Sequence, residues 1–167
     1  MNTKKLTFIS LVAAVYTVVS LLLAPITYGE MQIRIAEALT MLPLLNKDSI
    51  YGVTLGCFLT NLIGALTGLN PTGILDAFIG TLATFIAAYL TYKLRDKKVK
   101  TIPVLSILMP VILNFFFVGA ELAYLYMSDN FLMGILIMGT SVAAGELISV
   151  IVGYLFIPAL QKTKLFN

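Results

Sequence analysis

Three charged residues lie close together in an otherwise apolar part of this 167-residue chain. They are Glu30, Arg34 and Glu37, at spacings of i, i+4 and i+7. If this segment is a helix, the three side chains share one stripe on its surface. Charge at membrane depth is costly, and it normally faces a bundle interior, a cavity or a partner. The spacing therefore predicts either a polar binding site or a structural ion pair between Arg34 and Glu37.

A second group of polar residues lies in a later apolar stretch. Asn114 and Glu121 are seven residues apart, so on a helix they share a face, with Phe117 and Tyr124 nearby. A carboxylate, an amide and aromatic rings on one face are typical of one wall of a ligand pocket. Hydrogen bonding between helices is the alternative explanation.

Glu146 lies near the middle of the last apolar stretch, and Asn61 lies within the third. A buried carboxylate needs a cation or hydrogen-bond donors. Arg34 is the one basic residue expected at membrane depth, and it cannot satisfy four carboxylates. A donor-rich or cationic ligand is expected to supply the remainder, with protonation of one glutamate as the competing explanation. Asp76, in the first turn of another apolar stretch, is explained by the helix dipole.

The elements that position these groups follow from composition. Hydrophobic residues make up 59% of the chain and charged residues 11%, against about 25% charged in soluble domains, and the mean hydropathy is +0.98. This predicts an all-α, polytopic membrane protein with one helical bundle. Histidine is absent, Cys57 is the single cysteine, and there is no P-loop motif. We therefore expect no metal, no cofactor, no ATPase site, no enzyme activity and no nucleic-acid partner.

Six membrane spans are predicted, at about residues 6–28, 31–45, 49–69, 73–92, 102–127 and 131–160. The first is too long for a secretory signal core and is expected to stay uncleaved. Basic clusters at 4–5, 93–100 and 162–164 favour the cytoplasmic side. They share that side only if the short, charged segment 31–45 also crosses. The resulting even number of crossings predicts that both termini lie in the cytoplasm.

The first predicted span carries small residues that allow close helix approach. They are Ser10, Ala13, Ala14 and Thr17. Because the span itself holds no ionisable residue, we expect this face to contact another membrane subunit, with packing inside the bundle as the alternative.

Several segments of this chain resemble one transporter family. Residues 32–43 (QIRIAEALTMLP) resemble the signature of the QueT-type queuosine-precursor transporters, and residues 56–62, 118–122 and 145–147 are similar to the same family. The resemblance covers about residues 6–160. It implies the substrate-binding S component of an energy-coupling-factor (ECF) importer in the bacterial plasma membrane. Such a six-helix subunit docks on a coupling transmembrane subunit and two ATPases.

The resemblance also implies a 7-deazaguanine substrate, such as the aminomethyl precursor preQ1, or queuine. The ring edge of this ligand offers two adjacent N–H donors to one carboxylate, and a second carboxylate would pair with the ammonium group. Aromatic side chains would stack on the flat ring. The substrate-binding residues expected are Glu30, Arg34, Glu37, Asn61, Asn114, Phe117, Glu121, Tyr124 and Glu146.

Two alternatives stay open. One is a stand-alone secondary transporter of a purine-like or other small cationic nutrient, driven by protons through Glu37, Glu121 or Glu146. The other is an assembly subunit that binds no ligand.

Overall fold

The computed structural model describes residues 3–27 and 33–163. The long helices are α1 (Thr3–Leu22), α3 (Ser49–Thr67), α4 (Ile74–Leu94), α5 (Val104–Tyr126) and α6 (Phe131–Leu160). The short ones are α2 (Ala24–Thr27) and two 3₁₀ helices, η1 (Ile35–Leu44) and η2 (Ser128–Asn130). Over these residues the sole strand-like pairing is an isolated bridge between Val99 and Ile102. The all-α prediction is confirmed.

Each of the five long helices is long and apolar enough to cross a membrane. In the apolar 18-residue stretch that qualifies each helix as a span, less than half of the residues are buried inside the protein. Large apolar side chains such as Leu22, Leu66 and Leu132 are therefore exposed, which suits a surface surrounded by lipid. The chain is a multi-pass membrane protein.

The segment predicted as a second span differs from expectation. Instead of an α-helix over 31–45, it contains the ten-residue 3₁₀ helix η1, with Pro43 inside it. The Glu37 N–H donates to the Arg34 carbonyl at 2.8 Å and the Leu45 N–H to the Leu42 carbonyl at 2.9 Å, both three residues back. Pro43 has no N–H to give to a carbonyl four residues earlier. At about 2.0 Å per residue, η1 is about 20 Å long, shorter than the roughly 30 Å hydrocarbon core.

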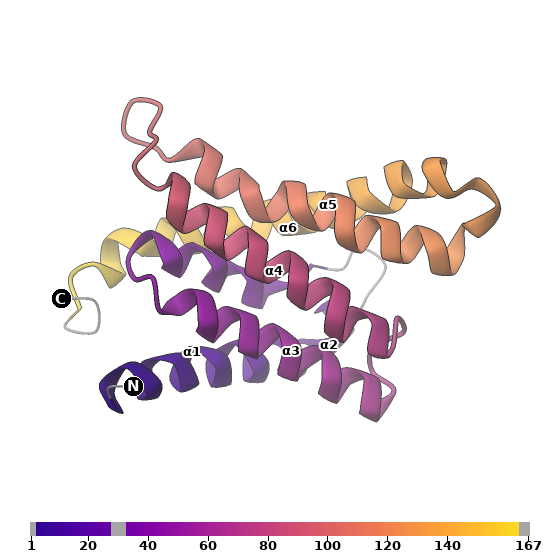
Figure 1. Ribbon diagram of the computed structural model, residues 1–167, viewed down its shortest axis with the longest axis horizontal. Helices are drawn as coiled ribbons and strands as arrows, with labels where there is room; N and C mark the ends of the chain where they lie inside the picture. Colours follow the sequence, from indigo (N-terminus) through magenta and orange to yellow (C-terminus); the bar gives the residue numbers. More distant parts are fainter. Residues whose placement is uncertain (1–2, 28–32, 164–167) are drawn as a thin grey trace.

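The helix η1 lies at the centre of the bundle. It contacts all five long helices. Consecutive long helices also pack against one another, and Figure 1 shows α1, α3, α4 and α5 side by side in chain order, with α6 behind α5. The buried residues of η1 are Ala36, Glu37, Thr40, Met41, Leu42 and Pro43. A segment surrounded in this way can hold polar groups away from lipid.

Glycines allow two of these close contacts. A Cβ on Gly56 of α3 would lie 2.6 Å from the Tyr16 Cβ of α1, and a Cβ on Gly153 of α6 would overlap the Ala38 carbonyl of η1. The α1–α3 contact also divides the small residues of α1. Ala13 and Thr17 are buried, and the Thr17 hydroxyl donates to the Gly56 carbonyl at 3.2 Å.

Ser10 and Ala14 stay exposed on the other side of α1. The expected contact with another subunit therefore rests on these two residues.

The basic clusters gather at one end of the bundle. Lys5 of α1 pairs with Asp48 before α3 at 2.6 Å. Leu44 of η1, Arg95 after α4 and Gln161 after α6 line one pocket. The start of α1 and the end of α6 lie at this same end (Figure 1). Leu44, the last residue of η1, also lies at this end, and a sixth crossing by the segment 31–45 stays a prediction.

Candidate substrate site

Arg34 and Asp76 form a buried ion pair. An Arg34 guanidinium nitrogen lies 2.5 Å from an Asp76 carboxylate oxygen, and the residues are 6% and 0% exposed. The predicted helical stripe does not include Arg34, and of the two alternatives for this segment the ion pair is formed with Asp76 and not with Glu37. Arg34 precedes η1 with φ −85° and ψ 81°, outside the helical range. Glu30, the third member of the predicted stripe, lies outside the described residues.

The turn between α3 and α4 supports Asp76. Asn70 donates from its amide nitrogen to the Asp76 carboxylate at 3.0 Å, and its amide oxygen accepts from the Thr72 hydroxyl at 2.7 Å. Asn61 of α3 donates to the Asp76 backbone carbonyl at 3.0 Å. Asn61 therefore makes a hydrogen bond between α3 and α4.

Glu37 is held from two helices. One of its carboxylate oxygens accepts hydrogen bonds from the Tyr16 hydroxyl of α1 at 2.5 Å and the Thr84 hydroxyl of α4 at 3.2 Å. Its other oxygen has no hydrogen-bond partner within the described residues. One oxygen of the Glu37 carboxylate is thus held by two hydrogen bonds, and the other can accept a hydrogen bond from a ligand.

Helices α5 and α6 contribute three further buried polar residues, Asn114, Glu121 and Glu146. The amide nitrogen of Asn114, both oxygens of Glu121 and one oxygen of Glu146 make no well-formed hydrogen bond in the described part of the chain, although Asn114 lies close to Glu146 and Thr72 close to Glu121. The charges of Arg34 and Glu37 act on Glu146, and those of Arg34 and Asp76 act on Glu121. Acidic residues of η1, α4, α5 and α6 therefore lie within electrostatic range of one guanidinium.

The cluster of Arg34, Glu37, Asp76, Glu121 and Glu146 contains more acceptors than donors. Within residues 3–27 and 33–163, Arg34 is the one buried cation. Buried carboxylates without partners are costly, and they are stabilised by a cation, by N–H donors or by a proton. In the same residues, no group of three or more acidic, cysteine or histidine side chains is arranged to hold a metal ion. The cluster is suited to an organic ligand that carries several N–H donors.

The predicted aromatic residues lie beside this cluster. Phe117 and Tyr124 line a groove of about 560 Å³ between α4 and α5, together with Glu121. Tyr124 is 66% exposed, so it belongs to the outer part of the groove. Glu121 thus lies between an apolar, aromatic surface and the carboxylate cluster.

Sequence reasoning missed three residues of this site. Asp76 was assigned to the helix dipole, and Tyr16 and Thr84 were not considered as partners of Glu37. A signal for Asp76 existed, because an acid and a base that both lie in apolar segments are expected to pair. The hydroxyls carried no comparable signal, since Tyr and Thr occur throughout the spans.

Comparison with known proteins gives two matches. The family described as "QueT transporter" matches residues 6–162. The "Queuosine precursor transporter QueT" of Lactococcus lactis subsp. cremoris is 31% identical over 91 residues, which are 53% of this chain and 50% of that protein. The match thus spans about half the length of this relative. No solved structure matches the chain.

Proposed function

We propose that this chain, which belongs to the QueT transporter family, binds a queuosine precursor of the 7-deazaguanine class as the S component of an ECF importer. The name of the Lactococcus lactis relative supports a queuosine precursor as the substrate, and the 7-deazaguanine class is what the family resemblance implies. The observation that carries the proposal is the set of unpaired carboxylate oxygens around Arg34. A ligand with a donor-rich ring edge and an ammonium group would satisfy them.

In the proposed complex, Glu121 accepts the two adjacent N–H groups of the ring edge. Both of its oxygens are unpaired, as a side-by-side pair of hydrogen bonds requires. Phe117 in the neighbouring groove offers an aromatic face to the ring. The ring plane thus lies where the groove meets the cluster.

Glu146 receives the ammonium group, with Asn114 beside it. Asn114 and Glu121 are separated by about 10.5 Å along α5, at 1.5 Å per residue. This separation allows a bicyclic ring and its aminomethyl arm to contact both. Glu37 contributes its unpaired oxygen, and Arg34 holds the acidic residues together. Contact of Glu30 with the ligand stays a prediction.

The importer assignment rests on features outside the site. The sequence holds no P-loop motif, so ATP would be hydrolysed by partner ATPases, and their coupling transmembrane subunit would dock on the exposed side of α1 at Ser10 and Ala14. We place both termini in the cytoplasm, because the basic residues gather at the end where α1 starts and α6 ends. The proposal thus counts η1 and its flanking residues as a sixth crossing. Binding then needs no nucleotide, whereas transport does.

Calorimetric titration of the purified chain with preQ1, queuine and guanine, without nucleotide, tests this proposal. A 7-deazaguanine should bind saturably and guanine much more weakly. Glu121→Gln should abolish measurable binding, since its amide offers one acceptor where two are needed. Asp129→Asn, at an exposed acid between α5 and α6, is the matched control and should bind normally. Failure of all three compounds to bind would end the substrate assignment.

A proton-coupled secondary transporter is the second candidate, favoured by the unpaired oxygens of Glu37 and Glu146. Such carboxylates are typical of proton relays. Vesicles that contain this chain alone decide between the two. Uptake of the precursor driven by an imposed proton gradient, without ATPase subunits, would replace the importer assignment.

A further inference from the structure

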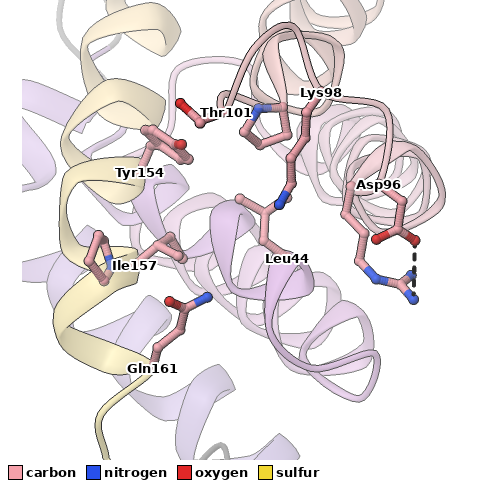
Figure 2. A pocket seen from close by; sticks show the side chains of 10 residues that line it. Leu44, Asp96, Lys98, Thr101, Tyr154, Ile157 and Gln161 are labelled. Atoms are coloured by element: carbon pink, nitrogen blue, oxygen red, sulfur yellow. Dashed lines mark ion pairs between the residues drawn. The ribbon is translucent and has the colours of Figure 1, made fainter.

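A polar pocket of about 290 Å³ lies at the basic end of the bundle, away from the carboxylate cluster. Figure 2 shows Tyr154, Ile157 and Gln161 of the α6 side along one wall, with Lys98 extending from the opposite side toward Leu44. We call this the basic-end pocket. It is formed where η1, α4 and α6 end and α5 begins.

The charges of the basic-end pocket are unbalanced. Arg95 and Lys98 line it with one acid, Asp96. Arg95 lies 3.7 Å from Asp96, whose side chain is 82% exposed, so this pair is weak. No described acidic side chain forms an ion pair with Lys98. Because helix C-termini carry partial negative charge, the ends of α4 and α6 alone would not attract an anion, and the two cations must do so.

The Arg95 side chain is held in place. Its guanidinium carbon lies 3.9 Å from the centre of the Tyr92 ring, and a guanidinium nitrogen donates to the Tyr92 carbonyl at 2.8 Å. The hydroxyl of Thr101 adds a neutral donor on the same lining. A fixed cation, a longer flexible cation and a hydroxyl are suited to an anion with several oxygens, such as a phosphate.

The position of the pocket indicates where that phosphate comes from. Helix α4 has 21 residues and is about 31 Å long, close to the hydrocarbon thickness of about 30 Å. Arg95 directly follows α4 and therefore lies at the depth of lipid headgroups. Large apolar side chains are exposed close in sequence to the pocket residues on α5 and α6: Leu105 lies two residues after Pro103, and Phe156 directly precedes Ile157. An acyl chain attached to the phosphate would lie along them.

We propose that the basic-end pocket binds the phosphate of an anionic phospholipid, contacted by Arg95, Lys98 and Thr101. Basic pockets between spanning helices on the cytoplasmic side are suited to such headgroups. This site is separate from the carboxylate cluster, so the proposal does not depend on the transported substrate.

Native mass spectrometry of the full chain in mild detergent tests this proposal, with phosphatidylglycerol and phosphatidylcholine as the probes. Phosphatidylglycerol should bind more tightly. Lys98→Gln should weaken its binding by at least about tenfold, as expected for the loss of one charge-assisted hydrogen bond. Thr101→Val, which changes no charge, should also weaken it.

Lys97→Gln is the matched control, because Lys97 lies in the same linker but does not line the pocket. It should leave phosphatidylglycerol binding unchanged. Equal losses in Lys97→Gln and Lys98→Gln would show attraction by net charge alone and overturn the proposal. Equal binding of the two lipids would overturn it as well. Inorganic phosphate that displaces the lipid at equal concentration would assign the pocket to a soluble anion instead.

Discussion

Replacing Arg34 should destabilise the protein more than replacing its partner Asp76. Arg34 is the one buried cation in residues 3–27 and 33–163. In Asp76→Asn, the guanidinium stays within the electrostatic range of Glu121 and Glu146, which can take over as its partners. In Arg34→Gln, four buried carboxylates are left without any buried positive charge. The two members of one ion pair are therefore unequal.

The magnitudes follow from the surroundings of the pair. Breaking a buried ion pair by removing one partner costs about 3–5 kcal/mol, and we expect Arg34→Gln to fall in that range. Asp76→Asn keeps an oxygen that can accept from Asn70 and loses one charge-assisted hydrogen bond of about 1.5–3 kcal/mol. Part of this loss is recovered when Arg34 turns to another carboxylate. We expect a net cost of about 1–2 kcal/mol.

Reversible unfolding of the purified chain in mixed micelles, followed by circular dichroism, measures both free energies. The double variant Arg34→Gln/Asp76→Asn separates the coupling of the pair from the single losses. Asp96, whose side chain is 82% exposed in its weak pair with Arg95, is the control, and Asp96→Asn should change stability by less than about 1 kcal/mol. Equal costs for the two single variants, or a larger cost for Asp76→Asn, would refute the reasoning that Arg34 serves several carboxylates.

Three further substitutions test other contacts of the bundle. Tyr16→Phe removes the 2.5 Å hydrogen bond to Glu37, and unfolding measurements should show a loss of about 1.5–3 kcal/mol. Gly153→Ala places a methyl group against the Ala38 carbonyl, and the same measurement should show a cost of about 1–3 kcal/mol from overpacking. Ala14→Leu enlarges the exposed face of α1. It should leave substrate binding intact but prevent transport by the assembled importer, measured as uptake into vesicles.

Each of these variants has a control in the same part of the molecule. Tyr51→Phe changes an exposed tyrosine and should be neutral, so an equal loss there would contradict the role of Tyr16. Ala159→Val, on the exposed side of α6, should be tolerated, unlike Gly153→Ala. Val15→Leu, at an exposed neighbour of Ala14, should transport normally. Normal transport by Ala14→Leu would remove the proposed docking face.

The long helices were predictable because an apolar run has few alternatives in a membrane. The spans expected at 49–69, 73–92, 102–127 and 131–160 appear as α3, α4, α5 and α6, within two residues at each end. The turn residues between α3 and α4 and the basic linker between α4 and α5 mark the ends of these helices. By contrast, the first span was expected to continue to residue 28, and α1 ends at Leu22 before the short α2. Pro25 lies inside α2 and cannot donate a hydrogen bond back to α1.

The centre of the site was less predictable. A 3.6-residue period was assumed for the segment 31–45, but η1 has the three-residue period of a 3₁₀ helix. Its side chains therefore face several helices instead of one. The partner of Arg34 is 42 residues away, and no local pattern shows which of the intramembrane acids it will contact. The composition indicated that positive charge is scarce within the spans, whereas tertiary packing decides that Arg34 pairs with Asp76.

The central position of η1 has a consequence for how this protein is made. The segment η1 has ten residues, contains Glu37 and follows Arg34. Inserting an ionised side chain at the centre of the membrane costs about 2.5–3.5 kcal/mol, so this segment is poorly suited to insertion on its own. We therefore expect its insertion as an independent helix to be unfavourable. Its largest contact is with α6, where Gly153 admits the Ala38 carbonyl. We therefore expect segment 35–44 to be stable in the membrane only when the long helices surround it, so that the polar centre is complete only once α6 has packed against η1.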